Sequence, residues 1–225
     1  MRTPSHEQNR YFILFIDDYS RMTWIYFMRE KPEIFKIFKK FKNLVKNQSG
    51  QRIKVLISDR GKEYNNSKFN KFCEEEGIDH QTTVSYNPQQ NGVSERKNRT
   101  VMEMVRSMLQ EKLLPKAFWA EAVYTAVYLL SRCPTKAVQN MIPLKAWSGK
   151  KPSAKYLRVF GSIHCVHIPI EKRHKLEEKI EKGIFLGYST QSKGYKIYNL
   201  NTKKLIISRD VEFDKGAMWN WDEEK

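Results

Sequence analysis

Strand-like and helix-like stretches alternate from the start of the chain to Arg132, and this alternation restricts the fold more than any other feature. Aromatic and β-branched residues predict two strands, Tyr11–Ile16 and Met22–Met28. A helix should follow, because Pro32 can start it, Gly50 can end it, and apolar residues recur between them at helical spacing. Strands that alternate with amphipathic helices are typical of an α/β domain.

The alternation continues through two further strands and three further helices. They are a strand at Ile53–Ile57, a short helix capped by Asn66 or Ser67, a strand within 78–86, and helices at 92–113 and 115–132. Residues 136–156 mix Pro, Gly and Lys without periodicity, so we interpret them as a connection.

The pattern changes to short strands from Leu157 onward, where Gly, Asn-Thr and charged turns separate stretches of β-forming residues. We therefore predict an α/β domain over 1–150, a small β-barrel over 151–218 and a tail over 219–225. The charge-rich stretch 171–183 is interpreted as a solvated loop rather than a binding arm.

The charge balance favours a polyanionic partner, and nucleic acid is the first candidate. The chain has 41 Lys and Arg against 25 Asp and Glu, a formal net charge of +16 and a pI near 9.7. Its three cysteines are widely spaced, which suggests neither a disulfide framework nor a zinc finger. Strand alternation places His164 and Cys165 on opposite faces, which argues against a metal site there. No apolar run resembles a signal peptide or a membrane span, so we expect the cytoplasm or nucleus, not secretion.

Two carboxylates stand out as candidate metal ligands. Asp59 follows the predicted strand that ends at Ile57, and Gly61 lets the backbone turn away. Thirty-five residues separate Asp59 from Glu95, enough for a helix, a strand and a loop that return the chain to the same sheet edge. Because converging carboxylates repel each other, a divalent cation such as Mg²⁺ should lie between them. On its own, Asp59 also fits an ordinary turn.

The helix that begins near Gly92 carries cationic residues close to Glu95. At 100° per residue Glu95, Met102 and the arginines Arg99 and Arg106 share one face, while Val101, Met104, Val105 and Met108 share the other. Arg96 and Lys97 extend the positive field, so this helix is a candidate to hold a phosphodiester backbone. The alternative is a solvated ion pair between Glu95 and Arg99. The preceding polar loop, 85–92, could close over a bound strand.

Several motifs of the chain point to a known family, namely "FIDDYSR", "SDRGKEY", "NPQQNGVSERKNRT", "LRVFGS" and "KGIFLGYS". With these motifs the chain resembles the integrases of Ty1/copia-type retrotransposons over nearly its whole length. The resemblance implies a ribonuclease-H-like core with an Asp, Asp, Glu triad, in which Asp59 is the second acid and Glu95 the third. It also implies two bound Mg²⁺ or Mn²⁺ ions, 3′-end processing and strand transfer on DNA, homo-oligomers on DNA, and an SH3-like domain after the core.

The sequence departs from this family at its start, because the first catalytic aspartate of the family lies on a strand upstream of "YFILFI". We expect Asp17 and Asp18 to shape a turn rather than replace that acid. Lys62 stands where the family commonly has Gly, and it could compete with a metal or grip phosphate. Two hypotheses follow: an integrase core impaired by the loss of one metal ligand, or a DNA-binding remnant without catalysis.

Overall fold

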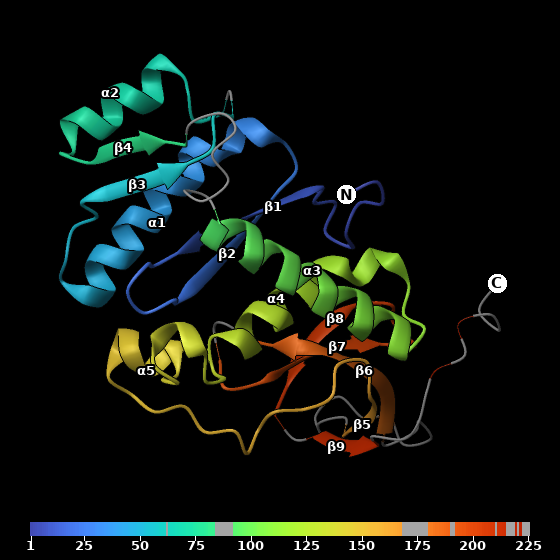
Figure 1. The fold of residues 1–225 in the computed structure, drawn as a ribbon. Helices are drawn as coiled ribbons and strands as arrows, with labels where there is room; N and C mark the ends of the chain where they lie inside the picture. The colour runs from blue at the N-terminus through green and yellow to red at the C-terminus, as the bar shows by residue number, and fades with distance from the viewer. Residues whose placement is uncertain are drawn as a thin grey trace. The chain divides into compact units, whose positions relative to one another are not determined.

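The computed structural model describes residues 1–61, 63–83, 92–167, 180–189, 192–209, 211–214, 219 and 221. The chain forms two compact units, one made of Met1–Val101 and Leu130–Pro152, the other of Met102–Leu129 and Ser153–Lys225 (Figure 1). No described helix is long and apolar enough to cross a membrane.

Within its described residues, the first unit contains two pairs of strands, three α-helices and the start of a fourth. Its elements are β1 (Tyr11–Ile16), β2 (Thr23–Met28), α1 (Ile34–Ser49), β3 (Val55–Ser58), α2 (Ser67–Glu75), β4 (Asp79–Thr82), the start of α3 (Gly92–Glu111) and α5 (Pro143–Ser148). β1 pairs with β2 in antiparallel fashion, and β3 pairs with β4 in parallel fashion. Asn66 caps α2 by accepting a hydrogen bond from the Phe69 amide at 2.9 Å.

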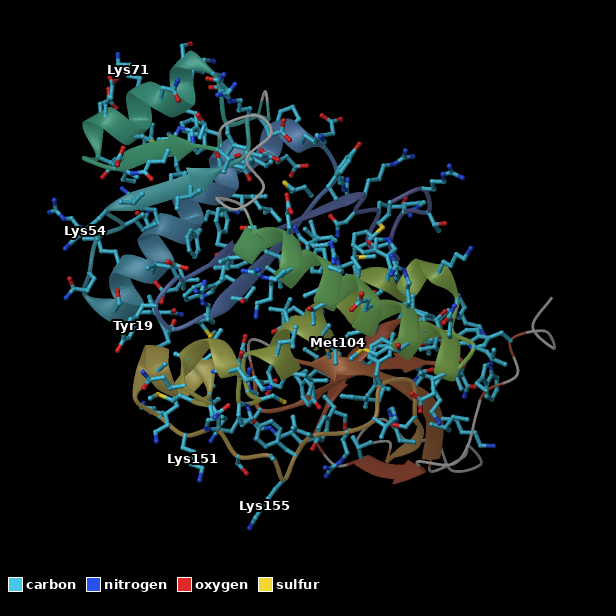
Figure 2. All side chains as sticks on the ribbon, viewed as in Figure 1. Tyr19, Lys54, Lys71, Met104, Lys151 and Lys155 are labelled. Carbon is cyan, nitrogen blue, oxygen red and sulfur yellow. The ribbon has the colours of Figure 1, made fainter. Side chains whose placement is uncertain are left out.

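Aromatic side chains hold this unit together. Phe38 of α1 is fully buried, and its ring stacks on Phe69 of α2 at 5.2 Å between centroids. Phe15 of β1 stacks on Phe41 of α1 at 4.2 Å. Because α1 contacts both β1 and α2, it is the element around which this hydrophobic core forms. On the solvent side, Lys54 and Lys71 extend away from the ribbon (Figure 2).

The second unit combines helix α4 (Trp119–Leu130) with a five-stranded sheet. The strands are β5 (Ile163–His167), β6 (Ile180–Tyr188), β7 (Tyr195–Asn199), β8 (Leu205–Ser208) and β9 (Val211–Asp214), in the spatial order β8-β7-β6-β5-β9. All of its pairs are antiparallel, and the register shifts between Phe185 and Gly187. This irregularity bends the longest strand, as a β-bulge does.

Helix α4 packs directly on this sheet. The Thr125 hydroxyl donates a hydrogen bond to the Leu186 carbonyl at 3.2 Å, and both residues are buried. The rings of Tyr128 and Tyr188 stack at 4.1 Å between centroids. A Cβ at Gly187 would lie only 2.6 Å from Thr125 Oγ1, so the close approach of helix and strand requires glycine there. The core of the second unit therefore includes a helix, α4, that precedes the sheet in the sequence.

The predicted fold class is confirmed: an α/β region precedes a small all-β region, and the hairpin, the helices and the strands occur where the sequence patterns placed them to within a few residues. The interpretation of 136–156 as a plain connection missed the short helix α5, which begins at Pro143. The domain boundaries at 150 and 218 stay predictions. Residues 85–91 of the polar loop and residues 171–179 of the charge-rich stretch lie outside the described residues.

A buried histidine makes the stability of the second unit depend on pH. His164 in β5 is 1% exposed, and burial lowers its pKa from 6.5 to about 4, although its contact with the Ser162 carbonyl opposes the shift. The unfolded chain takes up this proton near pH 6.5 and the folded chain only near pH 4. The contribution of neutral His164 to the free energy of unfolding is therefore fully present above pH 6.5. Up to about 3 kcal/mol of this free energy is lost as the pH falls toward 4. Amide hydrogen exchange in β6 at several pH values measures this loss, and a His164→Gln variant with the same pH slope would contradict it.

Candidate active site

Asp59 lies directly after β3, and local hydrogen bonds fix its backbone. Its Oδ1 accepts a hydrogen bond from the Gly61 amide at 3.1 Å, and its carbonyl accepts one from the Ser58 hydroxyl at 3.0 Å. The Asp59 side chain is exposed, whereas Ser58 is buried. The strand end therefore presents a positioned carboxylate to solvent, as expected for a ligand-binding edge of an α/β sheet.

Side chains of β4 and α2 support this strand end from behind. His80 Nε2 lies 2.9 Å from Ser58 Oγ, and His80 Nδ1 lies 3.3 Å from Asn70 Oδ1. Burial lowers the pKa of His80, with Asp79 opposing, so the neutral imidazole is favoured. Arg60 Nε donates to the Thr83 carbonyl at 3.1 Å, which ties the segment after Asp59 to the end of β4.

A second carboxylate, Glu63, faces the same small space as Asp59. A Cβ at Gly61 would lie 2.8 Å from Glu63 Oε2 and 3.0 Å from Asp59 Oδ1, so both oxygens lie close to Gly61. The other oxygen of Glu63 pairs with Lys31 Nζ at 3.4 Å. Burial, together with Asp59 and Glu63, raises the pKa of the Tyr64 phenol. Tyr64 thus remains neutral beside two acids.

Helix α3 brings its first turns to the same groove. Ser94 and Asn98 line a groove of about 250 Å³ together with Asp59 and Glu63. Glu95 lies between these two helix positions, but its side chain is exposed and is not among the residues that line the groove. The convergence of Asp59 and Glu95 on one ion therefore stays a prediction.

The cationic residues of α3 differ in exposure. Arg96, Arg99 and Arg106 are exposed, while Val101 and Val105 of the opposite face are buried, in agreement with the helical pattern. Lys97 is half-buried, and burial lowers its pKa, with Arg21 lowering it further. Lys97 therefore contributes less to an exposed positive field than its sequence position suggested.

Asp17 and Asp18 shape the turn between β1 and β2. Asp17 Oδ2 accepts hydrogen bonds from the Ser20 amide at 2.7 Å and from the Ser20 hydroxyl at 2.6 Å. Asp18 forms an ion pair with Arg21 at 2.5 Å. Both carboxylates are thus engaged within the turn.

Within the described part of the chain, no group of three or more His, Cys, Asp and Glu side chains is arranged to hold a metal ion. Lys62, predicted to compete with a metal or grip phosphate, lies outside the described residues. The pair Asp59 and Glu63 is what the structure brings together. Sequence reasoning missed Glu63 and Lys31, although an acid two residues after the Gly of an Asp-x-Gly turn was a signal that could have been used.

Comparisons with known proteins agree on one family. Residues 1–88 match the integrase core domain family, and residues 162–225 match the retroviral polymerase SH3-like domain family. The Pol polyprotein from transposon TNT 1-94 of Nicotiana tabacum is 45% identical over 95% of this chain. The corresponding protein from transposon RE1 of Arabidopsis thaliana is 36% identical over 95% of this chain. The chain spans only 16% and 14% of the lengths of these relatives.

A solved structure shows the same fold. A chain in the cryo-EM structure of the simian T-cell lymphotropic virus intasome, in complex with the PP2A regulatory subunit B56 gamma, matches with a TM-score of 0.50. The match covers 90% of this chain and 71% of that chain at 15% identity, so the likeness concerns the fold alone.

Proposed function

Because the chain belongs to the integrase family of retrotransposon Pol polyproteins, we propose that its core acts on DNA ends by metal-dependent 3′-end processing and strand transfer. The observation that carries this proposal is the groove at which Asp59, from the end of β3, meets the first turns of the helix that bears Glu95. Carboxylates on neighbouring elements at one sheet edge are what a metal-assisted phosphoryl transfer requires.

The donor set around Gly61 fits a hard divalent cation. Two carboxylate oxygens, from Asp59 and Glu63, lie close to Gly61, and Mg²⁺ and Mn²⁺ prefer oxygen ligands. We propose that Asp59 and Glu95 hold the ions and that Glu63 adds a carboxylate beside them. Bound there, a divalent ion would activate the attacking oxygen and stabilise the leaving oxygen.

The residues of this chain that would hold DNA are cationic and exposed. Arg96, Arg99 and Arg106 on α3 are proposed to contact phosphates, with half-buried Lys97 supporting them and Lys62, three residues after Asp59 in the sequence, as a further candidate. Such contacts position DNA without reading its sequence. We propose that the SH3-like region helps to hold DNA or a neighbouring copy of the chain, because the resemblance to these integrases implies a homo-oligomer on DNA.

The test is strand transfer on short linear DNA ends with Mn²⁺. It compares this chain with a version extended at its N-terminus by the family strand that carries the first aspartate, each with and without Glu95→Gln. Glu103→Gln is the matched control, since Glu103 is another exposed acid on α3. We expect product from the extended chain, abolished by Glu95→Gln and retained by Glu103→Gln. Product that survives Glu95→Gln would refute the proposed role of Glu95 as a metal ligand.

A second candidate function is DNA binding without catalysis. The formal net charge of +16, and the lack of a three-ligand acidic group among the described residues, favour it. It predicts that neither version gives product while both bind DNA with a steep salt dependence. The same strand-transfer experiment therefore separates the two functions.

A further inference from the structure

A series of polar contacts leads from helix α2 through β4 to the backbone of Asp59. Asn70 Oδ1 lies 3.3 Å from His80 Nδ1, and His80 Nε2 lies 2.9 Å from Ser58 Oγ. The Ser58 hydroxyl then donates a hydrogen bond to the Asp59 carbonyl at 3.0 Å. Three elements that lie side by side, α2, β4 and β3, therefore contribute to a series of contacts that ends at a proposed metal ligand (Figure 1).

The register of the two strands places His80 within reach of the end of β3. β3 and β4 are parallel, with Leu56 opposite His80 and Ser58 opposite Thr82. Residues two apart on a strand share a face, so His80 and Ser58 lie on the same face of this strand pair. The ring of fully buried Phe69, from α2, lies 5.2 Å from the His80 ring between centroids. The imidazole is therefore held between α2 and the strand pair.

The direction of these hydrogen bonds follows from the protons that are available. Ser58 has one hydroxyl proton, which it donates to the Asp59 carbonyl, so its oxygen must accept from His80. The neutral imidazole that burial favours in His80 has one N–H, which is therefore on Nε2. Nδ1 is then an acceptor beside the side-chain amide of Asn70, whose NH₂ group is the donor that such a nitrogen requires. His80 thus fixes the Ser58 hydroxyl in the orientation that reaches Asp59.

Hydrogen bonds hold the backbone on both sides of the Asp59 Cα atom. On the preceding side, the Ser58 carbonyl accepts from the Thr83 amide at 3.0 Å. On the following side, the Asp59 carbonyl accepts from the Ser58 hydroxyl, and the Gly61 amide donates to Asp59 Oδ1 at 3.1 Å. An exposed carboxylate on a backbone fixed in this way loses less conformational freedom when it binds an ion.

We propose that His80 is a positioning residue of the divalent-ion site, which acts through the Ser58 hydroxyl to hold the Asp59 carboxylate in place before the ion binds. His80 touches neither the ion nor DNA in this role, because Ser58 lies between it and Asp59. The inference rests on the proposed metal ligation by Asp59. Loss of a supporting residue of this kind costs about tenfold to a hundredfold in metal affinity, so the role is measurable without strand transfer.

The experiment titrates the full chain with Mn²⁺ and follows unbound Mn²⁺ by electron paramagnetic resonance. His80→Leu removes the donor to Ser58 and should weaken Mn²⁺ binding about tenfold. His80→Gln should bind almost as the unmodified chain does, because its amide N–H can take the place of Nε2–H. An equal loss in both variants would overturn the proposal. Gln81→Leu is the matched control: Gln81 is exposed, lies on the other face of β4 and donates to Asp79, so its replacement should leave Mn²⁺ affinity unchanged.

A double-mutant cycle shows whether His80 acts through Ser58. Ser58→Ala removes the hydroxyl and keeps the backbone hydrogen bond from Thr83, so it should weaken Mn²⁺ binding by a similar factor. The double variant should then bind Mn²⁺ no more weakly than either single variant, whereas losses that multiply would overturn the proposed route. Hydrogen exchange in β4 reports whether each variant is folded, and Ser58→Ala decides the matter if His80→Leu is not.

Asp59→Asn separates this inference from the proposed function on which it rests. If Asp59→Asn weakens Mn²⁺ binding while His80→Leu and Ser58→Ala do not, His80 has no positioning role and the proposed metal ligand stands. If Asp59→Asn leaves Mn²⁺ binding unchanged, or if the chain shows no saturable binding, the proposed ligation by Asp59 fails and the role of His80 fails with it.

Discussion

DNA binding by this chain should weaken about a thousandfold when the salt concentration rises from 50 to 200 mM, if it contacts six phosphates. The net charge of +16 attracts the chain to DNA, and binding releases counterions from each neutralised phosphate. A higher salt concentration makes this release less favourable and so weakens binding. The logarithm of the affinity should therefore fall linearly with the logarithm of the salt concentration. Fluorescence anisotropy with a short duplex, titrated at several salt concentrations, measures the slope.

Matched charge variants show which surface makes these contacts. Replacing Arg96, Arg99 and Arg106 by Gln should reduce the slope by nearly three, close to one for each lost phosphate contact. The control replaces three exposed lysines of α1, namely Lys36, Lys40 and Lys46, and removes the same charge. It should leave the slope almost unchanged. An equal reduction in both variants would mean that α3 is not the principal DNA contact.

Replacement of Phe38 by Ala should destabilise the first unit by about 3–5 kcal/mol. Phe38 is fully buried, stacks on Phe69 and contacts Phe15 at 6.0 Å between ring centroids, so truncation leaves a cavity where α1, α2 and β1 meet. Because the chain has two compact units, a single global unfolding transition is not assured. Hydrogen exchange of the α1 amides measures the loss locally, as a faster exchange rate in the variant.

The control for this prediction is Leu44→Ala in the same helix. Leu44 is 37% exposed, so its truncation should cost far less than that of Phe38. Exchange in β6 of the second unit should be similar in both variants. If Leu44→Ala accelerated exchange in α1 as much as Phe38→Ala, the aromatic cluster would not be the main source of stability.

The fold was predictable where periodicity is strong. The apolar spacing of α1, with Pro32 before it and Gly50 after it, marks a helix that buries one face, and the structure buries Ile34, Ile37, Phe38, Phe41 and Val45. Helix α5 was missed because its six residues are too few to show a period. The packing of α4 on the β sheet was also missed, because the hydrogen bond from Thr125 to Leu186 joins residues far apart in sequence.

The candidate site was predictable only in part. The strand end carrying Asp59 follows from an apolar run and a glycine, and the structure agrees. The neighbouring position of Glu63 depends on how the turn at Gly61 folds, and the lowered pKa of Lys97 depends on its burial and on the charge of Arg21 from the first hairpin. Both are tertiary effects that local patterns do not contain.

The connectivity of the two units limits how such a gene can be recombined. The chain passes between the units three times, after Val101, after Leu129 and after Pro152. A crossover between related elements at residue 152 would therefore join the five-stranded sheet of one parent to the α4 helix of the other. The new pairing would have to preserve the fit of Thr125 against Gly187. Exchange of the whole segment from 102 to the C-terminus keeps that contact within one parent, but it also carries residues 130–152 of the first unit along.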